Sequence, residues 1–243
     1  MSALHGMSQA VMLQYYRKGG MKMASAGFTR DEVILALDVL YSSEKQRVSA
    51  DSEAMIDLSA LLNRLPIHPP ENRRTDFRST TGVSTQLHRF RRSLISGKNN
   101  DSIGLLFFQI LLEFEGRFDE LHSIADAIRK NEPSFSAEFG SRTEDSGFPE
   151  GILLGHLHRL IEIRDGAKAP IGDHCEICSL KPELYYQPCG ELLQQHLLVS
   201  PIEMDGKKRY AANCFIMVCP NCHAALHCLR PWHTRDNCGD ILR

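Results

Sequence analysis

Residues 219–227 read Cys-Pro-Asn-Cys-His-Ala-Ala-Leu-His, and this short run contains much of the recognisable chemistry of the chain. Proline is tolerated in the first turn of a helix, so Pro220 is expected to open one. His223 and His227 are four positions apart, which places both imidazoles on one face of that helix. The run therefore predicts a short helix that begins between two thiols and turns two histidines to the same side.

A second Cys-x-x-Cys pair, Cys175-Glu-Ile-Cys178, lies upstream. Four thiolates in two such pairs are the ligand set of a closed, tetrahedral structural zinc site. All eight cysteines fall between Cys175 and Cys238, and in a chain without a recognisable signal peptide this favours metal binding over disulfides. The other four are expected to be buried or incidental thiols: Cys189, Cys214, Cys228 and Cys238.

The segment between the two cysteine pairs is about twice as long as in an ordinary zinc ribbon, so it contains an insertion. Within it, residues 192–198 are predicted to form a strand that presents His196, and residues 215–218 a second strand that leads into Cys219. Two imidazoles on the following helix can bind one divalent ion. A histidine on the strand can then activate water while the ion stabilises charge on a phosphodiester.

These motifs resemble the HNH (ββα-metal) endonucleases, especially the four-cysteine branch that includes McrA-type bacterial restriction enzymes. The resemblance covers residues 171–228 and rests on the cysteine pairs, on Gln195-His196-Leu-Leu and on the run from Asn213 to His227. It implies a structural Zn²⁺ and a catalytic Mg²⁺, Mn²⁺, Ni²⁺ or Co²⁺. The implied zinc ligands are Cys175, Cys178, Cys219 and Cys222. The resemblance makes His196 the general base and Asn213 the residue that orients the strand of His196. It makes His223 and His227 the ligands of the catalytic ion, and His223 also a catalytic residue.

Two positions depart from the family pattern. Gln195 stands where the family usually has a histidine or an aspartate that binds the metal, and a neutral amide oxygen is a poorer ligand. Asn213 stands one residue earlier than usual, with Cys214 in its slot. We therefore expect weak binding of the catalytic ion.

The net charge of −2 provides no general attraction to nucleic acid, so DNA binding has to depend on where the charges lie. Residues 71–98 contain seven basic residues against two acids. Three helices are predicted in this part of the chain. The first begins at a capping box formed by Thr29 and Glu32, the second covers residues 52–63 and the third residues 82–93. Three short helices of which the last is basic are similar to a helix-turn-helix. A solvated basic face is the plainer interpretation of the charges. The predicted DNA contacts are Arg73, Arg74, Arg78, Arg89, Arg91 and Arg92.

The chain is therefore predicted to be α+β, with a helical DNA-binding region followed by a zinc-stapled HNH nuclease domain. Residues 1–27 are predicted to be a disordered tail, 28–98 the DNA-recognition domain, 99–170 a helical linker region and 171–243 the nuclease. In the linker region, residues 103–128 are expected to form one long helix or two, 131–147 to be loose, and 148–164 to be helical. His156 and His158 are expected at the surface.

The function expected from this sequence is hydrolysis of DNA by an endonuclease of restriction or host defence, with modified DNA as one target. The alternative is a non-catalytic zinc protein that binds DNA through a degenerate HNH site. No run approaches the roughly 20 apolar residues that cross a bilayer, so no membrane association is expected, and the cytoplasm is the expected location. A homodimer is the simplest way for one such site to cut both strands.

Overall fold

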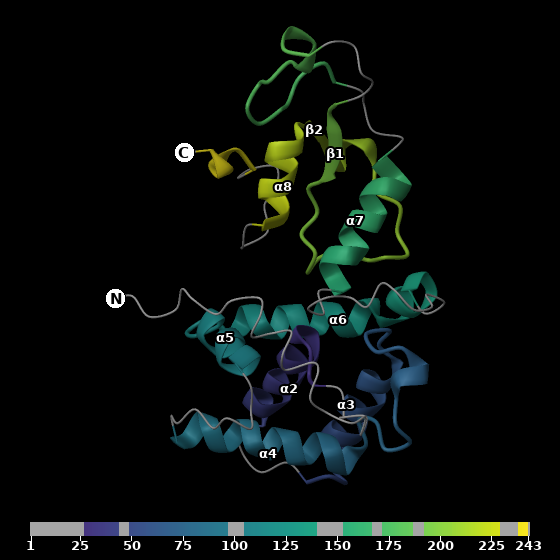
Figure 1. The fold of residues 1–243 in the computed structure, drawn as a ribbon, viewed down its shortest axis with the longest axis vertical. Coiled ribbons are helices and arrows are strands. Elements are labelled where there is room, and N and C mark those ends of the chain that lie inside the picture. Colours follow the sequence, from purple (N-terminus) through teal and green to yellow (C-terminus); the bar gives the residue numbers. More distant parts are fainter. Residues whose placement is uncertain are drawn as a thin grey trace, which may run out of the picture.

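The computed structural model describes residues 27–43, 49–96, 105–139, 153–166, 172–186, 192–228 and 238–242. Within these ranges the protein is α+β, as predicted, with many helices and one two-stranded antiparallel sheet. Helices α2 to α6 form one lobe, and α7, β1, β2 and α8 lie together in a second (Figure 1). No helix in these ranges is long and apolar enough to cross a membrane. The predicted tail lies outside the described residues, except for Gly27.

The helical lobe is built around α2 (Arg30–Ser42), which contacts each of the other helices in the lobe. Six of its apolar side chains are at most 2% exposed: Val33, Ile34, Leu35, Ala36, Leu37 and Leu40. An all-round apolar surface of this kind is what a central helix needs. Helices α3 (Glu53–Arg64) and α4 (Thr80–Ser96) lie where the sequence predicts them.

Two further helices, α5 (Leu105–Glu113) and α6 (Phe118–Phe139), complete this lobe. Of the one long helix or two expected over residues 103–128, the structure has two, with Gly116 at a φ of 72° in the turn between them. Both pack on α2, so these helices belong to the same core as residues 28–98 and are not a separate linker.

The prediction that residues 131–147 are loose is wrong as far as Phe139, because α6 continues to that residue. Asn131 is 1% exposed and donates to the carbonyl groups of Ala127 and Met204 at 3.0 and 3.2 Å. Phe135 and Phe139 are also buried. Packing against the second lobe thus stabilises a helix whose polar composition did not indicate one. The remaining residues, 140–147, lie outside the described ranges.

The second lobe consists of α7 (Leu153–Gly166), the strands β1 (Gln194–Leu197) and β2 (Phe215–Val218), and α8 (Pro220–Cys228). His196 pairs with Ile216 in the antiparallel register. Successive side chains of a strand point to opposite faces. Leu197 therefore joins the large core shared with the helical lobe, while Leu198 joins a small core around the cysteines. Helix α7 contacts both α6 and β1 and so connects the two lobes.

Candidate metal centres

The four cysteines of the two pairs gather at one point, as predicted. Their sulfur atoms lie within 4.8 Å of one another, and Cys178 Sγ is 3.8 Å from Cys219 Sγ. Four sulfurs bound to one zinc ion at about 2.3 Å are about 3.8 Å apart at the corners of a tetrahedron. All four are free thiols. The cluster is compatible with a structural zinc site.

Local backbone hydrogen bonds fix the position of the thiols in the first pair. In the first pair, Ser179 has a φ of 60° and its N–H donates to Cys175 O at 2.8 Å, which closes a tight knuckle. Glu176 ties this knuckle to β2, because its N–H donates to Met217 O at 2.9 Å and its carboxylate accepts from Met217 N at 2.8 Å. Burial opposes ionisation of Cys175, but surrounding backbone N–H groups outweigh it and lower the pKa of this thiol to about 7. A thiolate is the form that binds zinc.

A second cluster consists of Glu162 of α7, His196 of β1, and His223 and His227 of α8. The Nε2 atoms of His223 and His227 are 3.0 Å apart, and they lie 3.4 and 3.2 Å from Glu162 Oε2. Ligand atoms about 2.0 to 2.1 Å from one ion are about 3.0 to 3.4 Å apart. These three atoms therefore have the spacing of ligands around a common ion. His196 Nδ1 lies 2.8 Å from the other carboxylate oxygen, Oε1.

The second cluster is buried, which restricts the charge states of its members. Glu162 is 6% exposed and His196 4%. Burial disfavours ionisation of Glu162, but the four histidines around it outweigh that effect and hold the pKa of its carboxyl far below its usual range. Burial also lowers the pKa of His196 to about 4, against the opposing effect of the Glu162 carboxylate. A buried carboxylate that faces several imidazole nitrogens is the chemistry of a cation site.

The structure thus brings together the predicted residues His196, His223 and His227, and adds Glu162, which the sequence analysis missed. Glu162 precedes residue 171, where the predicted nuclease domain begins. Its only sequence signal is the spacing of four from His158 on an amphipathic helix. His158 itself was expected at the surface and is 3% exposed, so that expectation is wrong. His156 is half-buried.

The interpretation of Gln195 as a missing ligand also needs correction. Its side chain packs against the end of α7, where a Cβ on Gly166 would lie 2.5 Å from Gln195 Oε1. The neighbouring Gln194 is the one that meets the cluster, with its Oε1 2.5 Å from His223 Nδ1. The carboxylate comes from α7, not from the strand. Asn213 is exposed in the turn before β2, and its orienting role stays a prediction.

Comparisons of the chain with models of protein families, with curated proteins and with solved structures gave no match.

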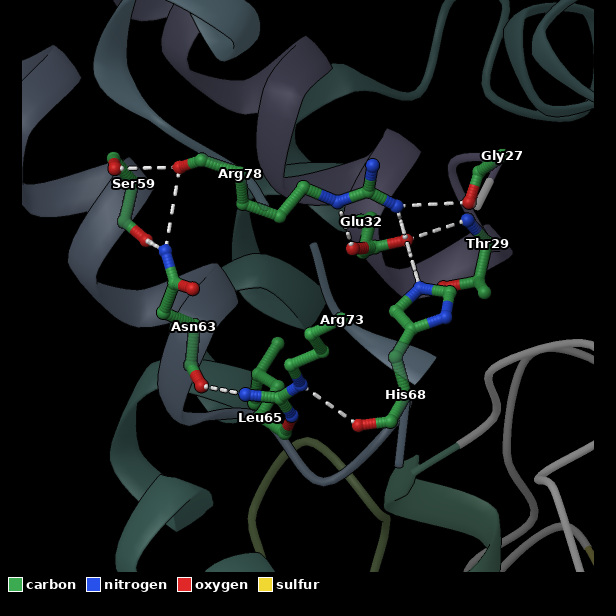
Figure 2. Close-up of polar contacts among 9 residues, drawn as sticks. All are labelled: Gly27, Thr29, Glu32, Ser59, Asn63, Leu65, His68, Arg73 and Arg78. Atoms are coloured by element: carbon green, nitrogen blue, oxygen red, sulfur yellow. Dashed lines mark hydrogen bonds and ion pairs between the residues drawn. The ribbon is translucent and has the colours of Figure 1, made fainter. Parts of the chain in front are cut away.

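Arg78 was predicted to contact DNA, and the structure corrects this. Its side chain is 7% exposed and forms a two-bonded ion pair with Glu32, from Nε to Oε1 at 2.7 Å and from one terminal nitrogen to Oε2 at 2.9 Å (Figure 2). Its guanidinium lies 4.2 and 4.8 Å from the ring centroids of Phe28 and Phe77. Arg78 therefore holds the first turn of α2 to the loop before α4.

Arg73 has a similar internal role. Its guanidinium donates to the backbone carbonyl groups of Asn63, Leu65 and His68 at 2.6, 3.1 and 2.9 Å (Figure 2). These bonds shape the loop after α3 and occupy the nitrogens that a phosphate contact needs. The other predicted DNA contacts differ in exposure: Arg91 is half-buried, and Arg74, Arg89 and Arg92 are exposed.

Proposed function

We propose that this protein is a metal-dependent DNA endonuclease of the HNH type, acting in restriction or host defence. The second cluster is the observation that carries the proposal. A strand histidine, two histidines of the following helix and a carboxylate converge on one point, and the four-thiol cluster lies at the start of the same helix. The order of two strands and a helix is that of a ββα-metal unit.

In this proposal, Glu162, His223 and His227 hold a divalent ion, and His196 activates the attacking water. An ion bound there supplies stabilisation of negative charge on the phosphodiester and its leaving oxygen. Gln194 Oε1 accepts from His223 Nδ1, which leaves the Nε2 lone pair directed at the site. His223 is the more exposed of the two helix histidines, with 20% of its side chain accessible against 9% for His227. The phosphate is therefore expected to approach on the His223 side.

The exposed arginines supply the DNA contact in the proposal. Arg89 and Arg92 lie on the solvent side of α4, and Arg74 lies in the loop before it. Arginine side chains bind phosphate oxygens without reading the bases, so they account for affinity and not for target sequence.

Nicking of supercoiled plasmid tests the proposal. The zinc-containing protein is incubated with Mg²⁺, Mn²⁺, Ni²⁺ or Co²⁺, beside Glu162→Gln and His196→Ala. Each substitution is expected to lower the cleavage rate by at least about a hundredfold, because each removes a group that acts directly on the ion or the water. His156→Gln, on the same helix as Glu162, is the control that should cut normally. A wild-type protein that binds plain and modified DNA but cuts neither with any of these ions would end the proposal.

One observation favours the non-catalytic alternative. All four residues of the second cluster present a ligand atom within 4.8 Å of the others, and a tetrahedral ion with four protein ligands has no open position for substrate. The cluster would then be a second structural site in a protein that binds DNA. The Glu162→Gln variant, which keeps the four thiols, separates the two functions. Loss of cleavage with the second lobe still folded supports the enzyme, and unfolding of the second lobe, with no cleavage by the wild type, supports the structural site.

A further inference from the structure

His158 is buried in the second lobe and takes no part in the reaction proposed above. It lies on α7 four positions before Glu162, so both side chains point to the same face of the helix. Helix α7 packs along β1, the strand that carries His196. Because His158 is only 3% exposed, its polar ring is expected to have partners inside the protein.

The backbone of β1 needs partners on the edge that faces away from β2. Within the described residues the sheet has two strands, so β2 lies along one edge of β1 only. The Leu198 N–H donates to Cys214 O at 2.8 Å, and the register places Leu197 opposite Phe215. Because bonded and non-bonded pairs alternate along an antiparallel ladder, the N–H and C=O groups of Leu197 point away from β2. Leu197 is 0% exposed, so these two groups have to be satisfied by protein atoms.

Helix α7 supplies both partners. The Nε2–H group of His158 donates to the Leu197 carbonyl oxygen at 3.0 Å, and the Leu197 N–H donates to Glu162 Oε1 at 3.2 Å. A carbonyl oxygen can only accept, which places a ring proton of His158 on Nε2. The two side chains, one helical turn apart, therefore do for the outer edge of β1 what a third strand would do.

These bonds act on the peptide groups next to His196. The Leu197 N–H belongs to the peptide bond that joins Leu197 to His196, and the Leu197 carbonyl belongs to the following one. Glu162 Oε1, which accepts from that N–H, also lies 2.8 Å from His196 Nδ1 and 3.2 Å from His158 Nδ1. The rings of His158 and His196 are neighbours, with centroids 5.3 Å apart. The backbone and the ring of His196 are therefore both held from the side of α7.

We propose that His158 is a positioning residue, which fixes the orientation of the His196 ring by holding the Leu197 carbonyl group and packing against that ring. The inference rests on the proposed function, in which His196 activates the attacking water. A general base has to keep its nitrogen within hydrogen-bonding reach of the water, and a displacement of about 1 Å can cost about a hundredfold in rate. His158 acts through His196 and does not itself touch the reacting atoms.

The contacts of His158 separate its effect from that of an ion ligand. In the described contacts it is not bonded to any of the three atoms assigned to the ion, which are Glu162 Oε2 and the Nε2 atoms of His223 and His227. Loss of the His158 side chain is therefore expected to lower the rate of cleavage and to leave the affinity for the ion nearly unchanged. Loss of an ion ligand would lower both.

Three variants of the full-length, zinc-containing protein test the inference: His158→Leu, His158→Gln and His156→Gln. Leucine removes the donor to the Leu197 carbonyl, whereas the side-chain amide of glutamine restores a donor at nearly the same place. At saturating Mn²⁺ and plasmid DNA, we expect His158→Leu to lower the cleavage rate about 10- to 100-fold. Its KM for DNA and its Mn²⁺ dissociation constant, measured by calorimetry, should stay within about twofold of the wild type. His158→Gln should recover most of the lost rate, and the control His156→Gln, on the same helix, should cut at the wild-type rate.

Nuclear magnetic resonance of the His196 ring gives a readout that does not depend on cleavage. Without Mn²⁺, its Cε1–H group is expected to give one sharp signal in the wild type and in His158→Gln, and a broadened or split signal in His158→Leu, because the ring then samples several orientations.

A folded His158→Leu protein with the wild-type cleavage rate and an unchanged His196 signal would overturn the inference, even if its free energy of unfolding were lower. If that variant does not fold, the wild type decides, and a split His196 signal there would overturn the inference. If the wild type cuts no DNA, the nuclease proposal fails, and the ring signals still show whether His158 positions His196.

Discussion

Replacing Arg78 by leucine distinguishes a structural arginine from one that binds DNA. The substitution removes the only guanidinium bonded to Glu32 among the described contacts, and Glu32 is 0% exposed. Breaking a buried ion pair by removing one partner costs about 3 to 5 kcal/mol, because the other charge stays buried and unpaired. Loss of the contacts with the Phe28 and Phe77 rings adds roughly 0.5 to 1 kcal/mol each. His68, 3.1 Å from Glu32, offsets part of this loss.

We therefore expect Arg78→Leu to lower the free energy of unfolding by about 4 kcal/mol. The measurement is urea denaturation followed by circular dichroism, with Arg92→Leu as the exposed control, for which a change within about 0.5 kcal/mol is expected. A double-mutant cycle with Glu32→Gln should show strong coupling, since the two side chains share their bonds.

DNA binding should respond to these arginines in the opposite way to stability, with a large effect of the exposed arginines and a small effect of Arg78. Neutralising Arg89 and Arg92 together should reduce the slope of log K against log salt by up to about 1.8, because each phosphate contact contributes about 0.9. Arg78→Leu, assayed where it is still folded, should keep the wild-type slope. If Arg78→Leu costs less than about 1 kcal/mol and reduces the salt slope as a surface arginine does, the structural assignment of Arg78 is refuted.

Three further predictions concern the metal sites and pH. Cys178→Ser should lose the structural zinc, seen as one fewer zinc ion per chain by mass spectrometry, and unfold the second lobe while the helical lobe keeps its circular dichroism; zinc retained at full stoichiometry would contradict this. Burial raises the pKa of Glu32, but His68 and the Arg78 guanidinium outweigh burial and hold that pKa below its usual value. The stability that the Glu32 carboxylate contributes is therefore complete above about pH 4.3, the ordinary pKa of a glutamate. It is lost as the pH falls through the lower pKa of the folded state. The stability difference between the wild type and Glu32→Gln should accordingly shrink on acidification, and a constant difference from pH 7 to pH 3 would refute the assignment. Gln194→Ala should weaken Mn²⁺ binding about 10- to 100-fold, measured by calorimetry, whereas Gln195→Ala should leave it unchanged; the reverse order would restore Gln195 to the metal site.

Much of the site was predictable because its spacing is local. A Cys-x-x-Cys pair and two histidines four positions apart have nearly the same geometry in any helix or knuckle that contains them, and the strand with His196 is adjacent to the second pair through β2. The helices α2, α3 and α4 were predictable for the same reason, since apolar periodicity and capping residues act within a few turns.

Only the tertiary structure decided which side chains from distant segments come into contact. Glu162 is one of several acids in amphipathic helices, and nothing within a few residues of it indicates that α7 lies along β1 and turns this carboxylate towards α8. Arg78 likewise stands in a basic run that is typical of a DNA-binding surface, yet it pairs with Glu32, 46 positions earlier. The burial of a charged side chain depends on which elements pack against it, and that packing is determined by the whole core, whereas the spacing of ligands within a helix is determined by the helix alone.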